Sequence, residues 1–171
     1  MNVHPESENE ESESQLRVLE ERRNAADRVL ALIREQIENQ SYQPSKAQTI
    51  AASWVHYEIE ALSFESDAFK EFLRLYPVRN QSFRILEEAR ISKIDQLKDI
   101  TQKAEQGNYS LLRRLFLNRG IDLYRNNPRK NRSSRLGISL MELGDKILNE
   151  GKPFQPPSLP AWQDPQFNSN F

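Results

Sequence analysis

Apolar residues recur every three or four positions along most of this chain, which is the spacing of one face of an α-helix. The stripes are longest in two segments, at about 14–39 and 82–107. No segment alternates apolar and polar residues in the way that a half-buried β-strand requires. The pattern predicts an all-α fold, a single bundle of five to six helices over residues 14–151. We expect the two long helices to pack antiparallel as the frame of this bundle.

The first predicted helix runs from Ser14 to about Asn39 and carries a heptad-like seam interrupted once by Arg23. The apolar seam residues are Leu16, Leu19, Ala26, Leu30, Ile33 and Ile37. We interpret the seam as the side that packs on the rest of the same chain. A coiled-coil homodimer through this seam is the alternative, and roughly three heptads is too short to favour it.

The middle of the chain is predicted to form three helices. Their expected bounds are Ser45 to Leu62, Ser66 to Tyr76, and Asn80 or Ser82 to Gly107. Pro44 and Pro77 interrupt helical geometry before the first of these helices and after the second. The third is the second long helix, and its stripe comprises Phe83, Leu86, Arg90, Ile94, Leu97, Ile100 and Ala104. Gly107 followed by Asn108 is a typical helix end.

The last part of the bundle is predicted to contain two helices. One begins near Tyr109 and is apolar around most of its circumference, which indicates a central, buried element. Its apolar residues are Leu111, Leu112, Leu115, Phe116 and Leu117. This helix either ends at Gly120 or continues to Arg125. The other is expected to begin with Ser134 as its cap and to close at Gly151.

Both ends of the chain differ from the bundle. Residues 1–13 are acidic and poor in apolar residues, so we expect a disordered arm. Residues 152–171 contain five prolines, which favour an extended path. This tail also carries large apolar residues, of which we predict that four dock onto a partner: Phe154, Leu159, Trp162 and Phe167. Packing of the tail on the chain's own helices is the alternative.

The composition of the chain indicates the cellular compartment in which we expect the protein. The chain has 171 residues, no cysteine and a net charge of −1. Without cysteine there can be no disulfide and no thiolate metal site. The first residues lack the apolar core of a secretory signal, and no apolar run approaches the roughly 18 residues of a membrane helix. We expect a cytoplasmic protein that does not contact membranes.

No catalytic motif is evident in the sequence. His56 and Glu60 lie four positions apart and could form an acid–base pair on one helix face. A lone histidine beside Trp54 and Tyr57 is more often a packed or surface residue, however. No pair of histidines or carboxylates has metal-ligand spacing, and the five glycines do not form a phosphate-binding loop. We therefore expect a non-enzymatic protein without cofactor or metal.

The strongest functional signal is a basic cluster between Arg113 and Arg135, where eight basic residues accompany a single acid, Asp122. A helix N-terminus surrounded by arginines can bind a phosphate or a carboxylate. The candidate anion- or partner-binding residues of this cluster are Arg113, Arg114, Arg125, Arg129, Lys130, Arg132, Ser133, Ser134 and Arg135.

Three interpretations of the basic cluster follow. It could be a solvated connector whose charges meet the chain's own glutamates, which are concentrated near the N-terminus. It could dock an acidic protein surface. It could also contact nucleic-acid phosphates without sequence specificity. We predict an adaptor or small subunit of a larger assembly that binds protein partners through the basic cluster and the tail, with nucleic-acid association as the alternative.

Overall fold

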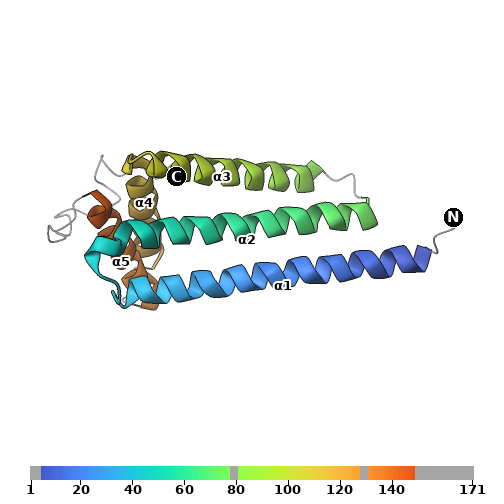
Figure 1. Ribbon diagram of the computed structural model, residues 1–171, viewed down its shortest axis with the longest axis horizontal. Helices are drawn as coiled ribbons and strands as arrows, with labels where there is room; N and C mark the ends of the chain where they lie inside the picture. Colours follow the sequence, from blue (N-terminus) through green and yellow to red (C-terminus); the bar gives the residue numbers. More distant parts are fainter. Residues whose placement is uncertain (1–4, 78–80, 128–130, 149–171) are drawn as a thin grey trace. The chain divides into compact units, whose positions relative to one another are not determined.

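The structure is a computed structural model that describes residues 5–77, 81–127 and 131–148 (Figure 1). Its elements are α1 (Pro5–Glu38), the 3-10 turn η1 (Pro44–Lys46), α2 (Ala47–Leu75), α3 (Gln81–Glu105), α4 (Ser110–Asn126) and α5 (Arg132–Leu148). Five α-helices and no strand are present in these ranges. The prediction of an all-α fold is confirmed.

The first helix begins earlier than the sequence pattern indicates. α1 starts at Pro5, so residues 5–13, which we expected to be a disordered arm, are helical. Proline is favoured as the first residue of a helix, and the glutamates behind it are good helix formers that suit the positive N-terminal end. Residues 1–4, the tail 152–171 and the predicted helix end at Gly151 lie outside the described residues.

The chain divides into two compact units. Unit 1 comprises Met1–Leu30 and Val55–Lys98, and unit 2 comprises Ala31–Trp54 and Asp99–Phe171. Three helices, α1, α2 and α3, contribute to both units, whereas α4 and α5 belong to unit 2. Unit 1 is thus built from segments of three helices, and unit 2 is built from the remaining segments of these helices together with α4 and α5.

The second and third predicted helices are one continuous helix, α2. The prediction of a break between Leu62 and Ser66 is wrong. No glycine or proline occurs there, and Ser66 does not cap a helix. Its hydroxyl instead donates a hydrogen bond to the Glu87 carboxylate of α3 at 2.6 Å. A serine in a helix interior is tolerated when its hydroxyl finds such a partner.

The continuity of α2 sets the directions of its neighbours. Within unit 1, the segment of α1 before α2 and the segment of α3 after it both run in the direction opposite to α2 (Figure 1). As a result α1 and α3 run in the same direction, so the expectation that these two long helices are antiparallel is wrong. That expectation counted one additional reversal at the predicted break.

The seam of α1 is its protected side. Ala26, Leu30 and Ile37 are buried, and Leu16 and Arg23 are half-buried, whereas most of the intervening residues are exposed. This burial agrees with packing of the seam on the same chain. The seam's three buried residues are not available to a coiled-coil partner, whereas Leu16, Leu19, Arg23 and Ile33 are only half-buried.

Unit 2 contains the core around α4. Its buried side chains include Leu112, Leu115, Phe116, Leu140 and Leu143. The ring of Phe116 meets that of Trp54 edge to face, with the ring centres 5.5 Å apart. Such a contact adds to the stabilisation gained from burying the two rings. The prediction of a central, well-buried helix here is confirmed.

Glycines bring α4 and α5 into direct contact. A Cβ atom added at Gly120 would lie 2.4 Å from the carbonyl oxygen of Gly137, and one added at Gly137 would lie 2.7 Å from that of Gly120. The two main chains therefore touch at this crossing. α4 continues through Gly120 to Asn126, so of the two predicted ends the later one is correct.

Two helices end in the same hydrogen-bond motif. After α3, Gly107 has a φ of 84°, its N–H bonds to the carbonyl of Ala104, and the N–H of Asn108 bonds to that of Lys103. After α1, Gln40 takes the same place with a φ of 50°. Left-handed backbone at this position is usual for glycine and costs energy for other residues.

Candidate functional site

The start of α5 organises the basic cluster in unit 2. Asn131 caps the helix: its side-chain oxygen accepts a hydrogen bond from the Ser134 N–H at 2.9 Å. The Ser134 hydroxyl in return accepts one from the Asn131 N–H at 3.1 Å. The cap is therefore Asn131 and not Ser134. Ser134 is buried within this motif, and its hydroxyl also donates to the Asn131 carbonyl.

Two arginines of the cluster are bound to acidic residues of the same unit. Nε of Arg132 donates a hydrogen bond to Oε2 of Glu38 at 3.0 Å. This hydrogen bond, and then the negative charge of Glu38, raise the pKa of Arg132. Nη2 of Arg113 lies 3.8 Å from Oδ1 of Asp145. Both pairs agree with the interpretation in which the chain's own acids neutralise part of the cluster.

Other members of the cluster point to solvent. Arg125 lies in the last turn of α4 and Arg135 in the first turn of α5, and both are exposed. Neither side chain forms an ion pair with another residue of the described ranges. Arg114 is also exposed, and Ser133 is half-buried. The exposed charge of the cluster thus includes both ends of the connection between α4 and α5.

Several predicted site residues cannot be placed. Arg129 and Lys130 lie outside the described residues, as do the tail residues Phe154, Leu159, Trp162 and Phe167. Only the helical members of the basic cluster are therefore described, and Arg113 and Arg125 lie near opposite ends of α4.

His56 and Glu60, which could form an acid–base pair by their spacing, make a surface contact in unit 1. Nε2 of His56 lies 2.9 Å from Oε1 of Glu60, and the two side chains are 62% and 38% exposed. The imidazole also packs edge to face on Tyr57. No group of three or more potential metal ligands occurs among the described residues. This geometry is that of an exposed pair one helical turn apart.

A groove in unit 1 has no counterpart in the sequence analysis. Its volume is about 530 Å³, and it is open to solvent. α1 contributes Leu16, Leu19, Glu20 and Arg23; α2 contributes Phe64, Glu65, Ala68, Phe69 and Phe72; and α3 contributes Arg90. Six of these ten residues are apolar, and the other four are charged residues of both signs.

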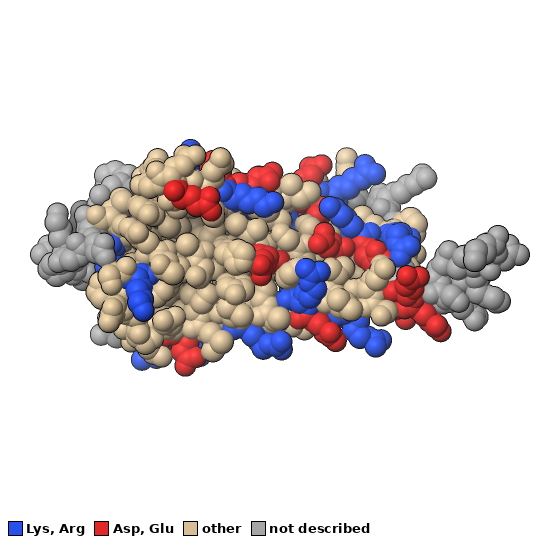
Figure 2. All heavy atoms as spheres, viewed as in Figure 1, with Lys and Arg blue, Asp and Glu red and all other residues tan. Residues whose placement is uncertain are grey.

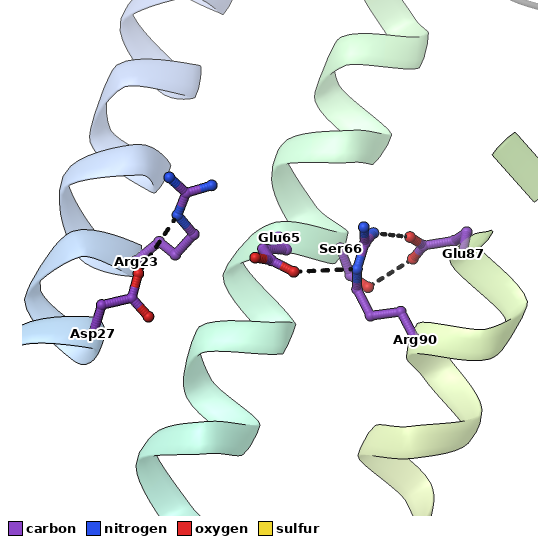
Figure 3. A network of polar contacts seen from close by, with 6 residues as sticks. All are labelled: Arg23, Asp27, Glu65, Ser66, Glu87 and Arg90. Atoms are coloured by element: carbon purple, nitrogen blue, oxygen red, sulfur yellow. Dashed lines mark hydrogen bonds and ion pairs between the residues drawn. The ribbon is translucent and has the colours of Figure 1, made fainter. Parts of the chain in front are cut away.

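Arg90 joins α2 and α3 beside this groove (Figure 3). Its Nε atom lies 3.4 Å from Oε2 of Glu65, and its Nη1 atom pairs with Glu87. On the opposite wall, Nε of Arg23 lies 3.9 Å from Oδ2 of Asp27 and is buried without a hydrogen-bond partner in the described structure. The groove edge is nearly neutral because its arginines face carboxylates.

One sequence signal could have indicated the groove. Arg23 and Arg90 interrupt the apolar stripes of the two long helices. An arginine in an apolar stripe marks a place where the helix face reaches solvent. The sequence does not reveal that the two interruptions lie at the same level of unit 1, because that depends on the uninterrupted length of α2.

Charge on the helices of unit 1 is mixed. Figure 2 shows acidic and basic side chains interleaved along these helices on the face drawn.

Among the described residues, no helix combines the length and the apolar character needed to cross a lipid bilayer. Comparison with protein-family models, with curated proteins and with solved structures finds no match to this chain. Functional inference therefore depends on the chain's own residues.

Proposed function

We propose that the chain is a non-enzymatic interaction protein that docks an acidic surface of a protein partner through the exposed arginines of its basic cluster, with the tail as a second contact. The observation that carries this proposal is the pair Arg125 and Arg135. Both are exposed beside the same short connection, and neither is engaged by a carboxylate of the described residues. Arginine presents a planar set of donors that matches a carboxylate in two-point contact.

The internal ion pairs favour a protein over a nucleic acid. Arg113 and Arg132 already face Asp145 and Glu38, so a phosphate would have to displace these carboxylates or lie beside them. Each neutralised arginine also reduces the counterion release that supports binding to nucleic acid. A protein surface can place a few carboxylates at the remaining arginines without approaching the internal pairs.

The test is equilibrium binding of the full chain to a glutamate-rich peptide and to duplex DNA of equal charge, over a series of salt concentrations. We expect the double variant Arg125→Glu/Arg135→Glu to lose peptide binding. The control Arg17→Glu/Arg28→Glu reverses two exposed arginines of α1 and changes the net charge equally, so it should retain binding.

Two results would contradict the proposal. Binding to neither probe would show that the exposed arginines are only solvated. Tighter binding to DNA than to the peptide, lost in Arg125→Glu/Arg135→Glu, would establish nucleic acid as the ligand.

A further inference from the structure

The end of unit 1 where α2 finishes and α3 begins exposes several large apolar side chains. Phe72 and Tyr76 lie on α2, or directly after it, and Phe83 and Leu86 lie on α3. Their exposed fractions are 41%, 56%, 39% and 62%. Together with the groove, these four residues are called the apolar face below.

Leu86 belongs to a helix face that is buried further along α3. Residues Phe83, Leu86, Ile94 and Leu97 share one side of the helix at 100° per residue. Ile94 and Leu97 are 7% and 2% exposed, whereas Leu86 at the same side is 62% exposed. The core-facing stripe of α3 thus extends beyond the part that other described residues of the chain cover.

The exposed residues are continuous with the groove. Phe72 lines the groove and packs on Tyr76, with the ring centres 5.1 Å apart. Phe69 also lines it and packs on Phe83, with the ring centres 6.0 Å apart. Isolated apolar residues are normal on a protein surface, but a connected set of this kind marks a contact site.

We propose that the apolar face is an interface between two copies of this chain, related by a two-fold axis. This inference is independent of the basic cluster. The exposed parts of the four side chains amount to roughly 400 Å², given the 150–250 Å² that a large side chain can bury, and the apolar lining of the groove adds to this area. A stable interface buries about 800 Å² per partner, of which somewhat more than half is apolar. The apolar face therefore has the size that a dimer requires.

The charges around the face fit a second copy better than a partner of one sign. Arg74 pairs with Glu71 at 2.5 Å, and Arg90 is held by Glu65 and Glu87. These two arginines are therefore matched by carboxylates of the same unit, and both signs of charge are present beside the face. A two-fold contact places the same rim against itself, where a surface of a single charge would repel its copy. Added helices in this position would extend the three-helix layer in the manner of a bundle.

The test is sedimentation velocity of the full chain between about 1 and 100 μM, a range in which an interface of standard size associates measurably. We expect a concentration-dependent dimer. Leu86→Glu should raise the dimer dissociation constant at least about tenfold, because the interface would then bury a carboxylate. Tyr76→Glu tests the α2 side of the face and should act in the same direction. Circular dichroism should show unchanged helicity in each variant.

Ile85→Glu is the matched control. Ile85 is also 62% exposed and precedes Leu86 directly, but it lies on the side of α3 away from the stripe. Its substitution should change the dissociation constant less than about threefold, as surface changes outside a contact do.

Three results would overturn the proposal. The first is a monomer throughout the concentration range, and the second is equal effects of Leu86→Glu and Ile85→Glu. The third is loss of the dimer in a full chain carrying Trp162→Ala, which would identify the tail as the occupant of the face.

Discussion

Gln40 and Gly107 occupy equivalent positions at the ends of α1 and α3, but only one of them is a glycine. The left-handed conformation costs a non-glycine residue about 1 kcal/mol or more. Gln40 offsets part of this cost with a hydrogen bond from its side chain to Glu142 at 2.5 Å, which is exposed. An exposed hydrogen bond contributes little net free energy.

We therefore predict that Gln40→Gly increases the free energy of unfolding by about 0.5–1 kcal/mol. The same substitution at Gln96, an exposed position inside α3, should decrease it by about 1 kcal/mol. Urea unfolding followed by circular dichroism measures both changes. A loss of stability in Gln40→Gly would mean that the contact with Glu142 outweighs the backbone strain.

Tyr42 provides a residue with a defined pH dependence. Burial, and then the charge of Glu142, raise its pKa from 10.0 to about 12. The folded chain therefore holds the phenol proton more tightly than the unfolded chain does. The resulting stabilisation is complete below pH 10 and is lost as the pH rises from 10 towards 12.

We predict that by about pH 11 the wild-type chain loses on the order of 1 kcal/mol more than Tyr42→Phe does. Urea unfolding below pH 10 and at about pH 11 compares the two. Parallel behaviour of wild type and Tyr42→Phe would place the Tyr42 hydroxyl in water.

At the scale of elements, the sequence predicts a helix end or a buried helix face correctly where residues close together in the sequence determine it. Gly107 ends α3 as expected, and the apolar circumference of α4 is buried as expected. The prediction fails where the partner is distant in sequence. Ser66 resembles a helix start until Glu87 of α3 satisfies its hydroxyl, and the glycines of α4 and α5 look isolated until the two helices cross.

The glycine crossing yields a prediction about α4 and α5. Gly137→Ala should decrease the free energy of unfolding by about 1–3 kcal/mol or more, because its Cβ would meet backbone atoms that cannot move aside locally. Gly144→Ala is the graded control, since its closest contact would be 3.1 Å and its cost should be smaller. Thermal unfolding of both variants measures the order. Equal or reversed effects would contradict a main-chain contact at Gly137.

At the scale of the whole molecule, burial is unequal between the two units. In the described residues, the buried apolar side chains of unit 1 are Ala26, Leu30, Val55, Ile94 and Leu97. Unit 2 contains a larger buried set, including most of the inner faces of α4 and α5. Local opening is favoured where few apolar contacts hold a segment.

We therefore predict that amides of residues 65–76 and 81–91 exchange with solvent deuterium faster than those of α4 and α5. Hydrogen exchange read by mass spectrometry, at a concentration where the chain is monomeric, tests this order. A Phe116→Ala variant, which opens the core of unit 2, should reduce the difference. Equal exchange rates in both units would mean that contacts other than these five buried side chains stabilise unit 1.

The basic cluster and the groove differ in how far the sequence predicts them. The exposed arginines of the basic cluster could be listed from the sequence, but the carboxylates that neutralise Arg113 and Arg132 could not, because they come from α5 and α1. The groove required the positions of three helices at once. Local patterns specify what each helix buries, whereas surface sites depend on how helices are aligned.

The contact between Gly120 and Gly137 also has a consequence for how this sequence can change over time. A substitution at either position meets the main chain of the other helix, so no exchange at a single neighbouring side chain can make room for it. Substitution of either glycine is therefore strongly disfavoured, even by alanine, the smallest residue with a Cβ atom. Gly107 faces open space and depends only on its own φ of 84°, so asparagine can replace it at modest cost. In a library of all single substitutions selected for folded protein, positions 120 and 137 should accept glycine alone, while position 107 should tolerate asparagine as well.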